Sequence, residues 1–406
     1  MRKILVISVS APPKTGAESI QTARYLKYLS RHFEICLITS KPEDRSWKRV
    51  DPTLSQYSRY IKNKVEIPIF SNTISRLSRY RLIPSRWSFP DSDFLFYFLG
   101  ILQLKKLRSW EPDLIYSRST PFSSAILAYK LKKKLNIPWV MHFSDPWADS
   151  PYRDNRYNDK DFKMEEKLIS TADKITLTSE NAVKLYKDRY PEHSVKFIYF
   201  PNVFDKNITT SQDISFNKKL RIVYSGNLYK KRGIKTLIQV LNYLRKFKPE
   251  LLGEFEILLA GNIDDYNLRI LKKSNLEIIS HIGHLTYMES NALIQSGHIL
   301  LTIDKIYENE VDHTFLPSKI MDYIAAKRLI LGITHPNSPT YNIVHDHFGK
   351  CFYHDQIPQI GNFIIALIRE YKCNNRSIFI PSGKNSFFSA DYQSQKLKST
   401  LDNIMK

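Results

Sequence analysis

Short apolar segments rich in isoleucine and valine alternate along the whole chain with longer segments of helical periodicity. This alternation is typical of parallel strands joined by crossover helices. The first series of strands is predicted at Ile4–Val9, Glu34–Thr39, Leu114–Ser117, Trp139–Phe143, Lys174–Thr178 and Ile198–Phe200. The second series is predicted at Arg221–Tyr224, Glu256–Leu259, Ile278–His281, Ile299–Ile303, Ile330–Gly332 and Lys350–Tyr353. The chain is therefore expected to be an α/β protein with two doubly wound parallel sheets.

The domain boundaries follow from where the two series stop and start. Residues 202–218 are polar and aperiodic, which indicates a linker between the series. A chain of 406 residues is also too long for one compact core. We predict a Rossmann-like domain at 1–205, a second one at 206–385, and a closing helix at 386–406 that returns to the first domain. The two domains are expected to face each other across a cleft.

The charge of the chain points to an anionic partner. Its formal net charge is +21, and residues 1–134 hold 25 lysines and arginines against 10 acidic residues. Such an excess fits a nucleic acid, a phosphorylated small molecule or a lipid surface. The cysteines, Cys36, Cys351 and Cys373, have no disulfide or zinc pattern. The longest apolar run, Phe94–Leu102, is about half of the ~20 residues that a membrane helix needs. A cytoplasmic protein is expected.

Ligands of open α/β sheets bind beyond the carboxyl ends of the strands, so the residues after each strand are the candidates. After the first strand, Gly16 can let the backbone approach a phosphate or sugar. After the strand at Trp139–Phe143, a polar turn contains the candidates His142 and Asp145. A lone histidine is more often structural than functional, and an aspartate before proline can simply shape a turn.

Two further strand exits carry cations. Gly226 and Asn227 follow the strand at Arg221–Tyr224, and Lys230, Lys231 and Arg232 come next. A glycine gives clearance and cations neutralise charge, so this segment can hold a diphosphate. In the segment Pro317-Ser318-Lys319-Ile320-Met321-Asp322, Ser318 is predicted to cap a helix whose amides and dipole face an anion. Asp322, one turn further, can accept hydrogen bonds from a ribose. The alternative for each segment is a solvated charge run or an ordinary cap.

At these residues the chain resembles the GT-B glycosyltransferases, in particular family 4, over nearly its whole length. Residues 316–323 are similar to the family's nucleotide-binding helix, in which the second acid of an E-x7-E pattern takes the ribose. That acid is Asp322 here. The first acid would fall at Thr314, so either Glu310 or Asp312 replaces it or no residue does. Residues 225–233 resemble the diphosphate clamp, and residues 144–147 resemble the turn that carries a histidine and an aspartate in the N-terminal domain.

The resemblance implies a retaining hexosyltransferase that moves a sugar from a nucleotide-diphosphate sugar to a cell-surface glycan. His142, Asp145, Lys231 and Arg232 are the expected catalytic residues, and the remaining candidates would bind the donor. No cofactor or metal is expected, because lysines and Arg232 can stabilise the leaving diphosphate. Two D-x-D tripeptides begin at Asp91 and Asp159, but a pattern this short recurs by chance.

The basic N-terminal half suggests where the acceptor enters. Aromatic residues interleave there with cations, among them Arg76, Arg79, Arg81, Phe98 and Lys105. This mixture suits shallow docking on anionic lipid, so we expect a lipid-linked acceptor and peripheral attachment to the inner face of the cell membrane. The alternative is that residues 94–102 form a core helix and the cations only solvate a surface.

Two other function classes stay open at this point. A nucleotide-sugar epimerase would use the same architecture, and its mark would be turnover of a sugar nucleotide without an acceptor. A nucleic-acid-binding protein would explain the net charge, but no DNA- or RNA-binding motif is recognised in the sequence. We therefore expect no nucleic-acid partner.

Overall fold

The computed structural model describes residues 1–42, 50–70, 73–74, 77, 89–151, 158–205, 219–229, 232–373 and 381–405. These residues form two compact units. One unit comprises Met1–Val203 together with Phe388–Lys406, and the other comprises Phe204–Phe387. The second unit is thus inserted between two segments of the first. In the described ranges, no helix combines the length and the apolar character that crossing a bilayer requires.

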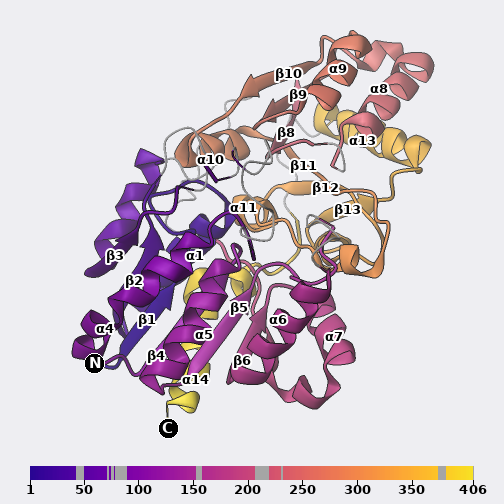
Figure 1. The fold of residues 1–406 in the computed structure, drawn as a ribbon. Helices are drawn as coiled ribbons and strands as arrows, with labels where there is room; N and C mark the ends of the chain where they lie inside the picture. The colour runs from indigo at the N-terminus through magenta and orange to yellow at the C-terminus, as the bar shows by residue number, and fades with distance from the viewer. Residues whose placement is uncertain are drawn as a thin grey trace. The chain divides into compact units, whose positions relative to one another are not determined.

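Within the described ranges, the first unit contains a seven-stranded parallel sheet in the order β3-β2-β1-β4-β5-β6-β7. Its strands are β1 (Lys3–Ile7), β2 (Glu34–Ser40), β3 (Asn63–Ile67), β4 (Leu114–Ser119), β5 (Trp139–Phe143), β6 (Lys174–Leu177) and β7 (Phe197–Tyr199). Its helices are α1 (Ala17–Leu29), α3 (Leu95–Gly100), α4 (Leu104–Trp110), α5 (Ser123–Leu135), α6 (Asn158–Thr171), α7 (Glu180–Arg189) and α14 (Ala390–Ile404). Figure 1 shows the helices on both faces of this sheet.

The second unit repeats this arrangement. Its described strands form a six-stranded parallel sheet in the order β10-β9-β8-β11-β12-β13. The strands are β8 (Leu220–Ser225), β9 (Phe255–Ala260), β10 (Ile279–Gly283), β11 (Ile299–Ile303), β12 (Leu329–Ile333) and β13 (Gly349–Phe352). The helices are α8 (Lys235–Phe247), α9 (Asp265–Ser274), α10 (Tyr287–Ser296), α11 (Lys319–Ala326), α12 (Pro339–Val344) and α13 (Ile357–Cys373).

The central strands are buried on both faces, which explains their unbroken apolar sequences. Every residue of β11 is buried, and so is every residue of β5. Helices cover both faces of such a sheet, and each helix buries an apolar stripe. On α8 this stripe includes Leu237, Val240, Leu241 and Leu244. Burial of such a side chain contributes roughly 1.5–3 kcal/mol, so these stripes hold the layers together.

The predicted strands are all present, and the prediction missed one. In β3, at the edge of the sheet, Lys64 and Glu66 alternate with the buried Val65 and Ile67. Its polar residues hide the apolar pattern that identifies the central strands. Most of the expected linker, residues 206–218, lies outside the described residues.

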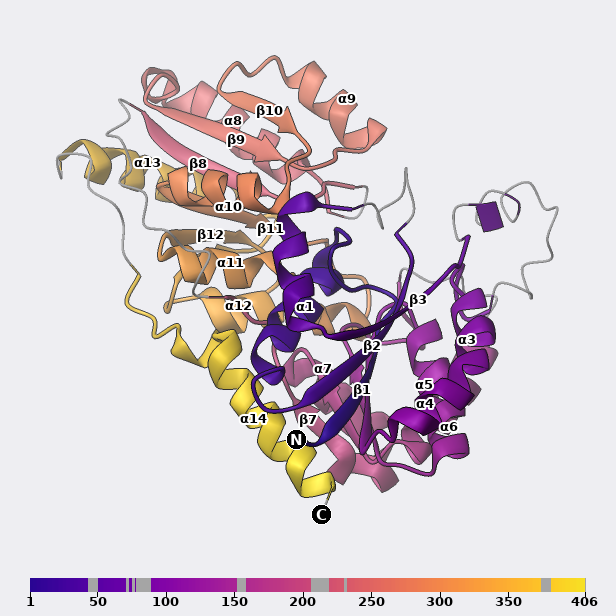
Figure 2. The ribbon, with the colours of Figure 1, turned by 90° about the vertical axis from the view of Figure 1, so that its left-hand side faces the viewer.

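The closing helix α14 packs in the first unit. Ala390, Leu397 and Leu401 belong to the same apolar cluster as Ile4 of β1 and Leu26 of α1. Arg2 also forms an ion pair with Asp402, with 3.2 Å between the charged atoms. Figure 2 shows α14 in yellow, with both chain ends at the same end of this unit.

Candidate functional site

The exits of β8 and β9 form a glycine-lined contact in the second unit. Gly226 has a φ of 145° and Gly261 a φ of 116°, which are values that other residues rarely adopt. A Cβ atom on Gly261 would lie 2.3 Å from the carbonyl oxygen of Gly226, so the two loops touch through their backbones. The clearance for a diphosphate that the sequence predicted at Gly226 stays a prediction.

Asn227, which the sequence placed in the donor site, has a role in this loop contact. Its side-chain oxygen accepts a hydrogen bond from the backbone N–H of Asn262, at 3.0 Å. Its carbonyl accepts another from the Tyr224 hydroxyl, also at 3.0 Å. Asn227 thereby ties the exit of β8 to the exit of β9 and to the ring of Tyr224.

Lys319 brings a cation to the exit of β8. Its ammonium nitrogen lies 3.5 Å from the centre of the Tyr224 ring and beside Gly226. The nitrogen is shielded from solvent and has no hydrogen-bond partner among the described residues. Burial, and secondly the charge of Arg232, lower the pKa of Lys319 well below its usual value, while Asp304 opposes this shift. A buried cation without an acceptor is unfavourable, so this position favours an incoming anion.

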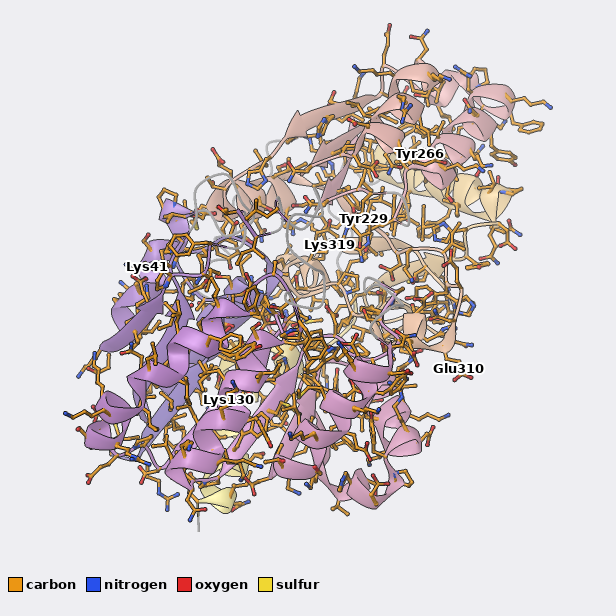
Figure 3. All side chains as sticks on the ribbon, in the orientation of Figure 1. Lys41, Lys130, Tyr229, Tyr266, Glu310 and Lys319 are labelled. Carbon is orange, nitrogen blue, oxygen red and sulfur yellow. The ribbon has the colours of Figure 1, made fainter. Side chains whose placement is uncertain are left out.

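Arg232 lies in the same part of the unit. Its guanidinium is stacked 5.5 Å from the centre of the Tyr229 ring, and the backbones of these two residues are hydrogen-bonded. Figure 3 labels Tyr229 and Lys319 in this region. Lys230 and Lys231, the other cations expected in the clamp, lie outside the described residues. The structure therefore brings together Gly226 and Lys319 of the predicted donor site and Arg232 of the expected catalytic residues.

Ser318 does not cap α11 in the way that the sequence predicted. Its backbone is helical, with φ −60° and ψ −27°, and its side chain makes no capping hydrogen bond. Short turns close the helix start instead, because Ile320 N–H donates to the Pro317 carbonyl and Met321 N–H to the Ser318 carbonyl, each at 3.1 Å. An anion at this helix start would therefore interact mainly with the Lys319 side chain and less with free backbone N–H groups.

Tyr323 and Asp322 follow on α11. The hydroxyl of Tyr323 accepts from the backbone N–H of Ser225 and donates to the carbonyl of Leu301, at 2.9 and 3.2 Å. It therefore fixes the helix to β8 and β11. The neighbouring Asp322 lies half-buried in the first turn of the helix. Its role toward the ribose stays a prediction.

Thr314 and the two acids that could replace the missing first acid have distinct surroundings in the structure. Thr314 is buried and its hydroxyl donates to the Val311 carbonyl at 2.6 Å. Asp312 is fully buried in an ion pair with Lys305, and it accepts hydrogen bonds from loop amides such as that of Glu308, at 2.7 Å. Glu310 is exposed, and Figure 3 shows it well apart from Lys319. Asp312 thus organises the loop before α11.

In the first unit, His142 has the surroundings of a structural histidine. It is 1% exposed within β5, and its Nδ1 lies 2.9 Å from the Thr176 hydroxyl. Burial, together with the charge of Arg118, lowers its pKa well below the usual value, so the ring is neutral. This matches the structural interpretation of a lone histidine better than the catalytic one.

Asp145 lies on a turn after β5 whose backbone is hydrogen-bonded to a buried carboxylate. The buried carboxylate of Glu165 accepts from the backbone N–H groups of Trp147 and Ala148 and from the hydroxyls of Tyr186 and Tyr190, at 2.7–3.2 Å. Burial raises the pKa of Glu165 despite these donors. Asp145 itself is half-buried at the exit of β5, where the sequence placed it.

A buried polar network beside this turn was missed by the sequence reasoning. Arg118 at the end of β4 is 1% exposed, and its Nε donates to Glu18 of α1 at 2.7 Å. The other oxygen of Glu18 accepts from Ser144, and a second Arg118 nitrogen donates to the Tyr116 hydroxyl at 3.0 Å. Glu18 lies in the first turn of α1, directly after Gly16, whose φ is 109°. Its distance from Arg118 in the sequence explains why no local pattern revealed the pair.

One acid of each D-x-D tripeptide accepts hydrogen bonds from a structural partner. Asp91 accepts from the N–H and hydroxyl of Ser123 at the start of α5, at 3.0 and 2.6 Å. Asp161 accepts from the indole of Trp147 at 2.7 Å. Among the described residues, no group of three or more His, Cys, Asp and Glu side chains is arranged to hold a metal ion.

The comparisons with known proteins agree with this geometry. The model of the family "Glycosyltransferase Family 4" matches residues 21–207. Residues 21–207 are therefore similar to this family, and the two parallel sheets have the arrangement of a two-domain α/β GT-B fold. A search of the curated proteins found no match.

Several solved structures share the fold at low sequence identity. HepE from Anabaena, solved with UDP, has a TM-score of 0.67 and 15% identity, covering 99% of this chain and 100% of its own. Sucrose-phosphate synthase from Thermosynechococcus elongatus has a TM-score of 0.69 and 14% identity, covering 100% and 99%. A UDP-N-acetylglucosamine 2-epimerase from Listeria monocytogenes, described as putative in its structure, has a TM-score of 0.58 and 10% identity, covering 99% and 96%.

Proposed function

We propose that this protein is a glycosyltransferase that moves a hexose from a nucleotide-diphosphate sugar to a lipid-linked cell-surface glycan, with retention of the anomeric configuration. The observation that carries the proposal is Lys319, a buried ammonium against Tyr224 with no described hydrogen-bond partner, beside the glycine at the exit of β8. A diphosphate is the anion that suits such a position, because oxygen acceptors would replace the hydration that burial removed. HepE, solved with UDP and with UDP and glucose, supports a uridine nucleotide as the first probe.

The chemistry that we propose needs no metal ion. When the bond between the sugar and the diphosphate breaks, negative charge grows on the leaving oxygen. Lys319 and Arg232 are cations already fixed near the exit of β8, and preorganised charges of this kind stabilise a transition state without reorganisation. We therefore expect turnover to persist in an excess of EDTA.

The donor site is tested by calorimetric titration of the full chain with UDP and UDP-glucose. Asp322→Ala should weaken binding of both ligands, because it removes the proposed ribose acceptor. Asp265→Ala is the matched control, since Asp265 is an exposed acid in the first turn of another helix of the same unit. Unchanged affinity in Asp322→Ala would remove this residue from the donor site.

Turnover assays address the reaction itself. With a lipid-linked glycan acceptor, the anomeric configuration of the product by NMR decides between retention and inversion. The same sample without acceptor tests the epimerase alternative, which is suggested by the structural similarity to the Listeria protein. Conversion of the sugar nucleotide with no acceptor present would replace the proposed function by epimerisation.

We also propose that the first unit docks on anionic lipid through one face, which we call the α3–α5 face. It contains exposed Phe98 and Leu102, 50% and 71% exposed. Lys130 lies 4.5 and 5.0 Å from the ring centres of Tyr97 and Phe98. Exposed Lys105, Lys106, Arg108, Lys133 and Lys134 belong to the same helices. Apolar side chains framed by lysines suit an anionic headgroup region, where each cation contributes about 1 kcal/mol. Arg76, Arg79 and Arg81, expected in this surface, lie outside the described residues.

Flotation with vesicles of phosphatidylcholine and phosphatidylglycerol tests the docking face. Lys105→Glu with Lys106→Glu should reduce the floated fraction, and so should Phe98→Ser with Leu102→Ser. Lys272→Glu with Lys273→Glu, on exposed positions of α9 in the other unit, is the control of equal charge change. Equal flotation of all variants would reject this face as the membrane contact.

A further inference from the structure

Four aromatic side chains form a compact group at the carboxyl ends of β11, β12 and β13. We call Tyr307, His313, His335 and Tyr353 the ring cluster. The ring of His335 stacks on Tyr307 with 5.4 Å between centres and contacts His313 and Tyr353 edge-on at 4.6 and 5.2 Å. Tyr307 and His313 meet edge-on at 4.9 Å. No role described so far uses these rings, although they follow strand ends where ligands of such sheets bind.

The ring cluster shares its neighbours with Lys319. Burial and the charge of Asp304 raise the pKa of Tyr307, while the guanidinium of Arg232 opposes that shift. Arg232 and Asp304 also act on the pKa of Lys319, as described above. Both groups are therefore within electrostatic reach of the same two residues. The strands β8, β11, β12 and β13 are parallel neighbours, so their exits lie at one edge of the sheet, and Thr334, next to His335, donates to the Asp304 carboxylate at 2.7 Å. A ligand whose diphosphate contacts Lys319 and Arg232 would extend along this edge toward the ring cluster.

The chemistry of the cluster suits a sugar without charge. Pyranose rings have apolar C–H surfaces, which pack on aromatic rings, and hydroxyls, which need both donors and acceptors. A neutral imidazole has one donor and one acceptor. In His335 the acceptor Nδ1 is already used by the backbone N–H of Asn337 at 3.1 Å, so the donor at Nε2 is the one left for a ligand. Burial and the proximity of His313 lower the pKa of His335, so its imidazole is neutral near pH 7. The Nδ1 atom of His313 is buried and has no hydrogen-bond partner in the described part of the chain.

The two acids expected to replace the missing first acid do not offer the same function. Asp312 is paired with Lys305, and Glu310 is exposed away from Lys319. Resting on the proposed function, we propose that His313 and His335 of the ring cluster bind the hydroxyls of an uncharged donor sugar. The cluster is then a determinant of sugar specificity.

The test compares the affinities for UDP and for UDP-sugars in the full chain. The wild type should bind the best member of a panel of UDP-glucose, UDP-galactose and UDP-N-acetylglucosamine more tightly than UDP, and more tightly than UDP-glucuronate. His313→Ala and His335→Ala should each weaken binding of that sugar nucleotide about tenfold, the loss of one good hydrogen bond. Their affinity for UDP should stay within about twofold of the wild type.

Controls separate the possible failures. His347→Ala changes an exposed histidine of the same unit and should bind both ligands as the wild type does. His335→Asn, which keeps a donor and an acceptor, should recover part of the lost affinity. Equal losses for UDP and UDP-sugar would assign the rings to the nucleoside, and no loss would remove them from the site; either result overturns the inference. A wild type that binds no nucleoside diphosphate would overturn the proposed function instead, and this inference with it.

Discussion

The buried ion pair between Lys305 and Asp312 should behave as one stabilising unit of the second domain. The two side chains are 3% and 0% exposed, so solvent does not screen their charges. Removing one partner leaves the other charge buried without compensation, which typically costs about 3–5 kcal/mol. For a domain of this size, that loss lowers the midpoint of thermal unfolding by about 6–20 °C.

A double-mutant cycle measures this coupling. Lys305→Met, Asp312→Asn and the double variant are compared by differential scanning calorimetry of the full chain, following the transition of the second unit. The double variant should be no less stable than the milder single variant, because no unpaired charge remains. Asp346→Asn is the control, since it breaks the exposed pair with Lys350 at 2.6 Å and should leave the midpoint unchanged. Additive losses in the cycle would show that the two residues do not act as a pair.

Three further outcomes follow from the structure. Gly261→Ala should destabilise the second unit more than Gly226→Ala, as measured by calorimetry. Both residues have positive φ, but only a Cβ at 261 would overlap backbone, at 2.3 Å from the carbonyl oxygen of Gly226. Equal effects of the two substitutions would contradict the loop contact. Burial lowers the pKa of His298 to about 4, and its Nδ1 accepts from the Arg221 N–H at 2.9 Å. The stability that the neutral ring contributes is therefore complete above the unfolded pKa of about 6.5 and is lost as pH falls toward 4. His298→Asn should flatten the pH dependence of the free energy of unfolding over this window. An unchanged slope would contradict this role of His298. Binding of UDP should raise the lowered pKa of Lys319 and therefore take up protons in the pH range where the free side chain loses its charge. Calorimetry in two buffers of different ionisation enthalpy measures the uptake, which Lys319→Met should abolish.

Most of the fold could be predicted because strand burial leaves a direct record in the sequence. Strands such as β5 and β11 are covered on both faces and are therefore continuous apolar runs. β3 was missed because an edge strand with one solvated face mixes Lys64 and Glu66 into its apolar pattern. The strand exits also led to Gly226, Arg232 and Lys319, since the position after a parallel strand is set by topology.

The rest of the candidate site depends on contacts that the sequence does not record locally. Glu18 and Arg118 are 100 positions apart and meet only because β1 and β4 are neighbours in the sheet. The ring cluster draws its members from the ends of three strands. Ser318 has the composition of a cap, but backbone geometry decides capping, and that residue is already helical. These side-chain contacts and the geometry of the helix start could therefore be identified only from the structure.

The inserted position of the second unit has a consequence for biosynthesis. The apolar cluster between α1, β1 and α14 receives Ala390, Leu397 and Leu401 from the far side of the insertion. A nascent chain on the ribosome presents α1 long before these leucines are translated. The inserted unit, which is continuous in sequence, can finish folding during that interval. Translation thus completes the first-begun domain last, and a chain that stops short of residue 388 leaves Tyr25 and Leu26 without part of their cover.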